Sequence, residues 1–262
     1  MKQYSTFHPL YMSFFSRSLY RDVGKNWKGL SFLYLLLLLA ICWIPIMFKM
    51  HSAVSGYIAD EVPKIVRQIP VITISNGEVS IDNDMPYIIT DPEKDDPFII
   101  IDTTGEYSSL DNTPARVLIT RTELIMKKSP SETRTFDLSE IEYLKIDRQT
   151  VYGWVETFRD WFAFLLYPFL VIASYIYRIV QVLLYAAIGL IIARNREVAL
   201  DYQSLISLAI VSATPAIIVN ALYNYGDIVM PFWWLICFMI SMGYLFFGIK
   251  ANAGDEDPIQ QL

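Results

Sequence analysis

Few residues of this chain could do chemistry, and the first is a carboxylate in a short polar run. Asp102-Thr103-Thr104-Gly105 directly follows the apolar stretch 98–101. Catalysis by carboxylates usually needs a pair that shares one proton, and the run has no second copy in the chain. Aspartate and threonine side chains also bond the backbone of turns, and glycine readily takes a positive φ. We therefore expect a polar turn after a strand, and keep hydrolysis through Asp102 as an alternative.

The second candidate is Arg178, the single charged residue of the apolar block 161–193. A charge in the membrane core costs roughly 2.5–3.5 kcal/mol on insertion scales, which makes such residues functional candidates. We expect Arg178 to pair with Asp227 or a lipid phosphate, or to extend toward the membrane surface. A substrate pathway would bring four polar side chains to one cavity: Arg178, Gln181, Thr214 and Asn220. Tight helix packing is the alternative explanation of the same residues.

No metal or cofactor site is expected. His8 and His51 fall on opposite sides of the expected membrane, while Cys42 and Cys237 lie inside apolar blocks. These positions allow no His-pair metal site, no Ser-His-Asp arrangement and no disulfide framework. The acidic loop 91–96 lacks the ligand spacing of an EF-hand, and no glycine-rich phosphate loop occurs.

Four apolar blocks are long enough to cross a bilayer, whose hydrocarbon core of about 30 Å needs about 20 helical residues. They are residues 29–48, 161–193, 202–224 and 228–249. The first block is longer than a signal-peptide core, so it is interpreted as an uncleaved anchor. Bases in short loops favour the cytoplasm. Bases precede the first block and follow the second and fourth, so both termini are expected to be cytoplasmic.

The second block is too long for one upright span. Because Pro168 disfavours helix just before it, residues 161–167 are expected to lie at the membrane interface. The span itself would then cover about 170–193. Two short helices, giving five crossings in total, are the alternative.

Residues 9–27 are expected to form a helix that lies in the membrane plane. Two stripes recur at every fourth position: Tyr11, Phe15, Leu19 and Val23 are apolar, and Ser13, Arg17, Arg21 and Lys25 are polar. Residues 1–28 carry a net charge of +4, so Arg17, Arg21 and Lys25 are candidate contacts to an anionic membrane surface. Packing on the protein's own spans is the alternative, and both can hold together. No basic field suited to nucleic acid lies beyond this segment.

Between the first two blocks, residues 50–160 hold 20 acidic and 11 basic residues. After a helical start, apolar residues alternate with a period of two, and Asn76-Gly77 marks a hairpin. A second tight hairpin is expected about residues 121–123, and a capping-box pattern predicts a short helix over 138–146. The segment is therefore expected to be a mainly antiparallel sheet domain.

Together these patterns predict an α-helical integral membrane protein with four transmembrane helices. An extracytoplasmic, mainly antiparallel β domain of α+β type is inserted between helices 1 and 2. The expected divisions are a cytoplasmic amphipathic helix at 1–28, transmembrane helix 1 at 29–48, the extracytoplasmic domain at 49–160, an interfacial segment with transmembrane helix 2 at 161–193, transmembrane helices 3 and 4 at 202–224 and 228–249, and a disordered acidic tail at 250–262.

Several stretches of the chain resemble a bacterial inner-membrane family known as domain of unknown function 1189. They are Phe15–Leu30, Trp43-Ile44-Pro45, Pro63–Pro70 and Ile101–Gly105. The run from Tyr202 to Ala216 is also similar to the Yip1-like membrane proteins. The resemblance implies a multi-pass protein of the bacterial inner membrane with an extracytoplasmic insert. It implies no catalytic residues.

The function expected from these patterns is non-enzymatic. The outer domain of an adaptor or sensor would bind a partner, either another membrane protein or a second copy of this chain, and the spans would hold it in the lipid bilayer. A small transporter, or an accessory subunit of a transport system, is the alternative.

Overall fold

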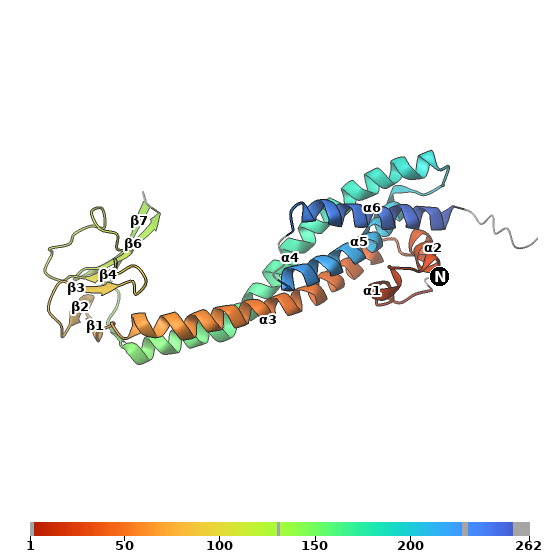
Figure 1. Ribbon diagram of the computed structural model, residues 1–262. Helices are drawn as coiled ribbons and strands as arrows, with labels where there is room; N and C mark the ends of the chain where they lie inside the picture. The colour runs from red at the N-terminus through yellow and green to blue at the C-terminus, as the bar shows by residue number, and fades with distance from the viewer. Residues whose placement is uncertain (1–2, 130–131, 227–229, 254–262) are drawn as a thin grey trace, which may run out of the picture. The chain divides into compact units, whose positions relative to one another are not determined.

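The computed structural model describes residues 3–129, 132–226 and 230–253, and the chain divides into two compact units (Figure 1). One unit, residues 1–50 with 163–262, is helical. The other, residues 51–162, combines two β-sheets with segments of two long helices.

Within the described residues, the helical unit contains six helices, two of which continue into the other unit. They are α1 (Pro9–Met12), α2 (Arg17–Asn26), α3 (Leu30–Val66), α4 (Arg148–Asn195), α5 (Tyr202–Tyr225) and α6 (Trp233–Asn252). In the part of the chain that the structure describes, α3, α4, α5 and α6 are each long and apolar enough to cross a membrane. These four helices indicate a multi-pass membrane protein.

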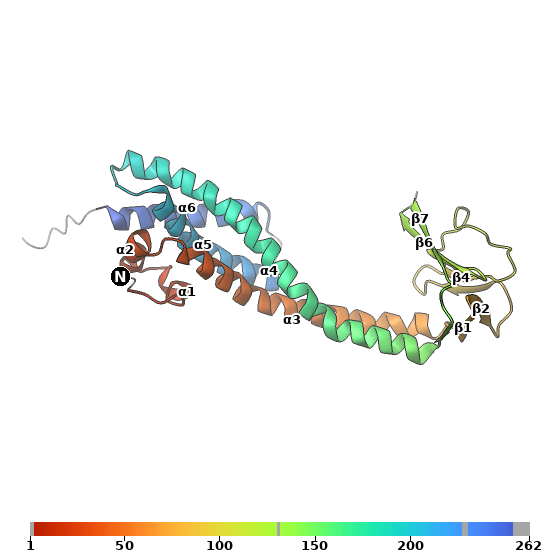
Figure 2. The same cartoon turned by 180° about the vertical axis from the view of Figure 1, so that it is seen from behind.

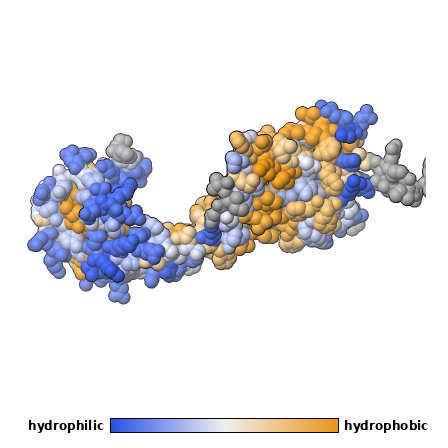
Figure 3. All heavy atoms as spheres, viewed as in Figure 1, coloured by the Kyte–Doolittle hydropathy of each residue, from blue (hydrophilic) through white to orange (hydrophobic). Residues whose placement is uncertain are grey.

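Helix α5 forms the centre of the helical unit. Its residues from 207 to 217 are all buried, including the polar Ser207, Ser212 and Thr214. In contrast, α4 and α6 carry large exposed apolar side chains, such as Phe169 and Trp234. The surface of this unit is accordingly largely hydrophobic in Figure 3. A surface of this kind suits contact with lipid hydrocarbon.

Helix α4 runs unbroken through Pro168, so the expected break before the proline is wrong, and the placement of residues 161–167 at the membrane interface stays a prediction. The two short helices of the five-crossing alternative do not form either. Helix α3 supports α4 on both sides of the proline: Tyr167 and Tyr175 donate hydrogen bonds to the carbonyls of Ala40 and Phe32 at 2.8 and 3.3 Å. Packing of this kind lets membrane helices tolerate proline.

The N-terminal segment forms two helices, so the single helix predicted over 9–27 is wrong. Helix α1 ends at Met12 and α2 begins at Arg17. Ser16 lies between them with an extended backbone, and its Oγ accepts the N–H of Leu19 at 3.3 Å. A serine in this position starts a new helix because it satisfies a backbone donor that the helix leaves free.

The described residues of the sheet unit form a three-stranded and a five-stranded sheet, and Figure 2 shows this unit from behind. The smaller sheet has the order β2-β1-β8, with β1 (Ile72–Ser75), β2 (Glu78–Ile81) and β8 (Tyr143–Ile146). The larger has the order β3-β4-β5-β6-β7, with β3 (Tyr87–Thr90), β4 (Pro97–Ile101), β5 (Val117–Ile119), β6 (Glu123–Ser129) and β7 (Glu132–Asp137). Only β4 and β5 pair in parallel among these neighbours, so the predicted mainly antiparallel sheet is confirmed.

Both predicted hairpins are present. Strands β1 and β2 pair across Asn76 and Gly77, whose φ angles of 50° and 79° are what a type I′ turn requires. A Cβ at Gly77 would also lie 2.6 Å from the Cα of Ser139. Strands β5 and β6 pair across the second turn, where the N–H of Thr120 bonds the carbonyl of Glu123 at 2.9 Å.

The short helix predicted over 138–146 is wrong, because its second half is strand β8. This strand pairs with β1, and the partly buried Leu144 and Ile146 pack into the core between the sheets. Ser139 caps no helix, since its N–H donates to Oδ1 of Asp137 at 2.8 Å in a turn. The alternation of apolar residues outweighs the local capping pattern, because it buries side chains.

Candidate functional site

Arg178 begins a chain of hydrogen bonds along one face of α4. Its guanidinium donates to Oε1 of Gln181, whose Nε2 donates to the hydroxyl of Tyr185 at 2.8 Å. The three residues lie three and four positions apart, so they face the same side of the helix. The guanidinium also lies 5.8 Å from the centre of the Tyr177 ring. Neutral groups on its own helix thus solvate this charge.

A small cavity of about 70 Å³ adjoins the guanidinium. Helices α3, α4 and α5 line it with Leu39, Cys42, Trp43, Ile46, Ser174, Arg178, Ile217, Asn220, Ala221 and Asn224. Since a water takes about 30 Å³, the cavity is the size of about two waters. It offers a cation, a thiol and two carboxamides to whatever fills it.

The structure brings together two of the four residues expected to line a pathway. Arg178 and Asn220 both line the cavity, and Asn220 Oδ1 accepts the indole N–H of Trp233 at 2.8 Å. Gln181 is not among the residues that line the cavity, but it accepts a hydrogen bond from Arg178, which does line it. Thr214 lies elsewhere, bonded to the hydroxyl of Tyr34 at 2.8 Å.

Arg178 is expected to pair with Asp227, which lies outside the residues that the structure describes. At that end of α5, Lys49 donates to the carbonyl of Tyr225 at 2.9 Å and lies 5.9 Å from its ring centre. This lysine was not singled out from the sequence, because it ends the first apolar block and looks like an ordinary flanking base.

The carboxylate of Asp102 is fully occupied by its own turn. The residue is buried, Oδ1 accepts the N–H and the hydroxyl of Thr104 at 2.8 and 2.5 Å, and Oδ2 accepts the N–H of Tyr107 at 2.6 Å. Gly105 has the positive φ of 89° that this turn needs. The carbonyl of Thr103 accepts from Arg121 at 3.2 Å. This geometry is that of the expected polar turn.

The electrostatics of Asp102 agree with a structural role. Burial on its own raises the pKa of this carboxyl, but the bonds from Thr104, Tyr107 and the Gly105 backbone outweigh it and hold the pKa below its usual value. A general acid at neutral pH needs the opposite shift. The described residues also contain no group of three or more His, Cys, Asp or Glu side chains that could hold a metal ion.

The basic N-terminal residues have different surroundings. Arg17 and Lys25 are exposed, whereas Arg21 donates through Nε to the carbonyl of Ala251 at the end of α6, at 2.8 Å. Of the predicted apolar stripe, Leu19 and Val23 are fully buried in the core of the helical unit, while Tyr11 and Phe15 are exposed. One half of the stripe therefore packs on the protein's own helices and the other half does not.

Sequence reasoning missed Asp22, which is the centre of a buried polar cluster. Its carboxylate accepts the indole N–H of Trp27 at 2.9 Å and the side chain of Asn26 at 2.8 Å, and it also accepts backbone N–H groups of Gln3 and Tyr4. Burial raises the pKa of Asp22, but these donors together hold it below the usual value. The one sequence signal that could have identified Asp22 is its position as a lone acid among bases, five residues before a tryptophan.

Comparisons with known proteins give one finding on identity. No curated protein and no solved structure matches the chain, and the similarity of the later spans to Yip1-like proteins finds no support. The model of a family described as protein of unknown function, DUF1189, matches residues 7–249. This match covers nearly the whole chain, which therefore belongs to the DUF1189 family.

Proposed function

We propose that this protein is a non-enzymatic adaptor or sensor of the bacterial inner membrane, whose sheet unit binds a partner outside the cytoplasm. The charge pattern supports this orientation, since bases precede α3 and follow α4 and α6, and bases favour the cytoplasmic side. Both termini are then cytoplasmic. The partner is a membrane protein or a second copy of this chain.

The observation that carries the proposal is the edge strand β7. All six of its residues are exposed. It is the last strand in the order of the larger sheet, where it pairs with β6. An edge strand offers a row of free backbone N–H and C=O groups, which is a template for a further strand. The edge also presents apolar side chains, because Phe136 of β7 and Met126 of β6 are 47% and 42% exposed.

This edge favours an extended protein segment as the bound group. Added strands take their affinity from main-chain hydrogen bonds and their specificity from alternate side chains. In β7 the alternate residues Arg134 and Phe136 lie on one face, and Thr133 and Thr135 on the other. The surface of the sheet unit in Figure 3 is otherwise mostly hydrophilic.

Photo-crosslinking in native membranes tests the proposal. A photoreactive residue placed at Thr135 on β7 should give one reproducible adduct with a defined membrane protein or with this chain. The same residue at Ser80, on the edge strand β2 of the smaller sheet, is the matched control and should give none. Phe136→Ser should remove the adduct, whereas Tyr143→Ser, at another exposed aromatic position, should keep it. Equal adducts from both strands, or none from Thr135, would contradict the proposal.

The cavity beside Arg178 favours transport as the second candidate function. In that case cysteines introduced at Arg178 and Asn220, which line the cavity, should react with a water-soluble thiol reagent in intact membranes, in a chain whose native thiols are removed by Cys42→Ser and Cys237→Ser. A cysteine at Thr214 should not, because this position is buried against Tyr34. Absence of labelling at both cavity positions would remove the transport role and leave the adaptor.

A further inference from the structure

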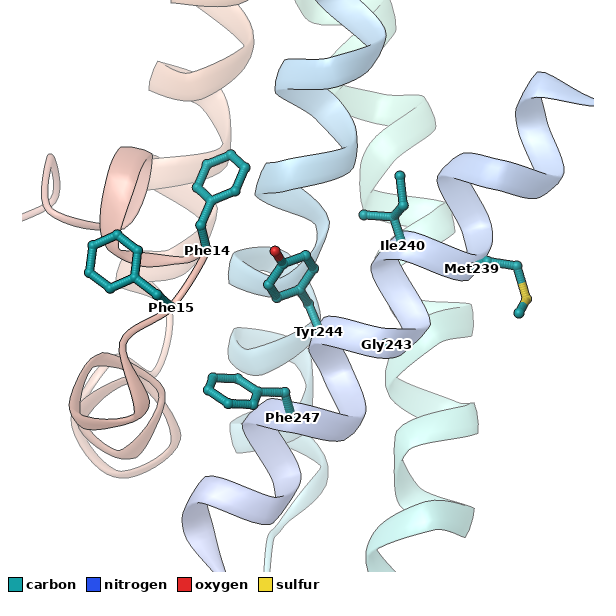
Figure 4. A pocket seen from close by; sticks show the side chains of 7 residues that line it. All are labelled: Phe14, Phe15, Met239, Ile240, Gly243, Tyr244 and Phe247. Carbon is teal, nitrogen blue, oxygen red and sulfur yellow. The ribbon is translucent and has the colours of Figure 1, made fainter. Parts of the chain in front are cut away.

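An apolar groove lies between helix α6 and the loop that joins α1 to α2. We propose that it binds one acyl chain of an anionic phospholipid, whose headgroup is held by Arg17. The groove has a volume of about 430 Å³ and is lined by Phe14, Phe15, Met239, Ile240, Gly243, Tyr244 and Phe247. Figure 4 shows Phe14, Tyr244 and Phe247 around the space between the loop and the helix.

The groove is preformed, because aromatic contacts hold its two walls. The rings of Phe14 and Tyr244 pack edge to face with their centres 6.3 Å apart, and the rings of Tyr20 and Phe247 pack in the same way with their centres 5.5 Å apart. Gly243 forms an open floor, since a Cβ built there meets no heavy atom within 4 Å. A side chain in place of this glycine would therefore occupy the groove without displacing the protein.

The surroundings of Arg17 indicate the charge of the occupant. Its guanidinium lies 5.8 Å from the centre of the Phe247 ring, which lines the groove. In the part of the chain that the structure describes, Arg17 has no carboxylate partner. Residues 1–28 also carry a net charge of +4. A cation at the end of an apolar groove is complementary to a phosphate joined to an acyl chain.

The N-terminal segment that includes the loop wall of the groove also carries exposed aromatic side chains. Phe7, Tyr11 and Phe15 are 59%, 56% and 66% exposed. Aromatic side chains of this kind gather where membrane hydrocarbon meets the headgroups. This placement puts an acyl chain beside α6 and the phosphate at the level of Arg17, which is the arrangement of one phospholipid in its leaflet.

Native mass spectrometry of the delipidated full-length protein in detergent tests this site. Dioleoyl-phosphatidylglycerol should bind as one saturable adduct, and dioleoyl-phosphatidylcholine about fivefold more weakly, because one basic contact near the surface contributes roughly that factor. Glycerol phosphate, which has the charge without the chains, should not bind. Equal binding of the two lipids, or binding of glycerol phosphate, would overturn the proposal.

Two pairs of variants locate the adduct. Gly243→Leu should abolish it by filling the groove, while Gly153→Leu, at another glycine with open space around its Cβ, should leave it unchanged. Arg17→Gln should weaken phosphatidylglycerol binding about fivefold and remove the preference over phosphatidylcholine. Arg194→Gln, at an exposed position at the end of α4, should not.

The same spectra distinguish other occupants of the groove. Should Gly243→Leu fail to fold, Phe15→Ser provides the second variant, because this exposed ring can be removed without opening the core, and it should weaken the adduct. A protein dimer that Gly243→Leu dissociates, with no lipid adduct in either form, would assign the groove to a second copy and overturn the lipid site. An adduct that survives both variants would also overturn it.

Discussion

Pairs of buried polar side chains join distant helices in the helical unit, whereas the buried carboxylate of Asp102 in the sheet unit bonds the backbone beside it. Ser31 with Ser207 and Tyr34 with Thr214 join α3 to α5 across 176 and 180 positions of the chain. In the sheet unit, Asp102 bonds groups two and five positions away. The same residue types therefore hold helices together in one unit and shape loops in the other.

The backbone explains this difference. A helix satisfies its own N–H and C=O groups except at its ends, so its polar side chains are free to bond another helix. The loops of the sheet unit leave backbone N–H groups unpaired, and a nearby carboxylate can accept them. Asp137 and Asp147 accept the N–H groups of Ser139 and Thr150 in this way.

Asp22 combines both roles, and its removal is expected to have the largest effect. Asp22→Ala leaves the indole of Trp27 and three other donors without their acceptor. Hydrogen bonds to a charged group contribute about 1.5–3 kcal/mol each, and their effects overlap, so we expect a loss of about 3 kcal/mol. Heat unfolding of the purified full-length protein, followed by tryptophan fluorescence, measures it. Asp22→Asn keeps one acceptor oxygen and should lose less; equal stability of Asp22→Ala and the wild type would contradict the assignment.

Asp102→Ala should act locally and less strongly. It frees the N–H groups of Thr104 and Tyr107 in a buried turn, which costs about 1–3 kcal/mol. Hydrogen exchange should accelerate over residues 103–107 and stay unchanged in α5. Thr103→Ala is the matched control, since the turn uses the carbonyl of Thr103, and it should exchange like the wild type. Faster hydrogen exchange in both units would contradict the prediction that Asp102 stabilises only its own turn.

Acid should weaken these same two clusters. The pKa values of Asp22 and Asp102 are both lowered in the folded protein from a usual value of 3.8. A lowered folded pKa means that the stabilisation is complete above the usual pKa and is lost as the pH falls through the folded pKa. Fluorescence-detected stability should therefore stay level from pH 7 to about pH 5 and decline below about pH 4. Asp102→Asn should decline less steeply, and a decline already complete at pH 5 would refute this linkage.

The sequence was enough to predict elements whose local pattern and packing agree. Residues 29–48 carry no charge, and all of them except Gly29 lie in helix α3. Asn76-Gly77 specifies its turn, because both residues tolerate a positive φ there. Asp102 could be assigned to a turn because its partners lie within five residues of it.

Elements that depend on distant contacts could not be predicted in this way. Strand β8 exists because it pairs with β1, about 70 positions earlier, and this pairing overrides a capping-box pattern. The continuity of α4 through Pro168 rests on bonds to α3. The cluster around Asp22 depends on Gln3 and Tyr4 folding back on α2, which no periodicity indicates.

The smallest expected effect tests whether the long-range bonds of the helical unit stabilise it. Tyr34→Phe removes the hydroxyl that bonds Thr214 and keeps the buried ring. Hydrogen bonds between membrane helices average about 0.6 kcal/mol, so a loss of that order is expected in denaturant unfolding. Tyr177→Phe is the control, because this ring is 64% exposed and its contact with Arg178 is to the ring face. If the two variants were equally stable, apolar packing alone would hold α3 against α5, and the polar pairs would serve to fix the register of the two helices.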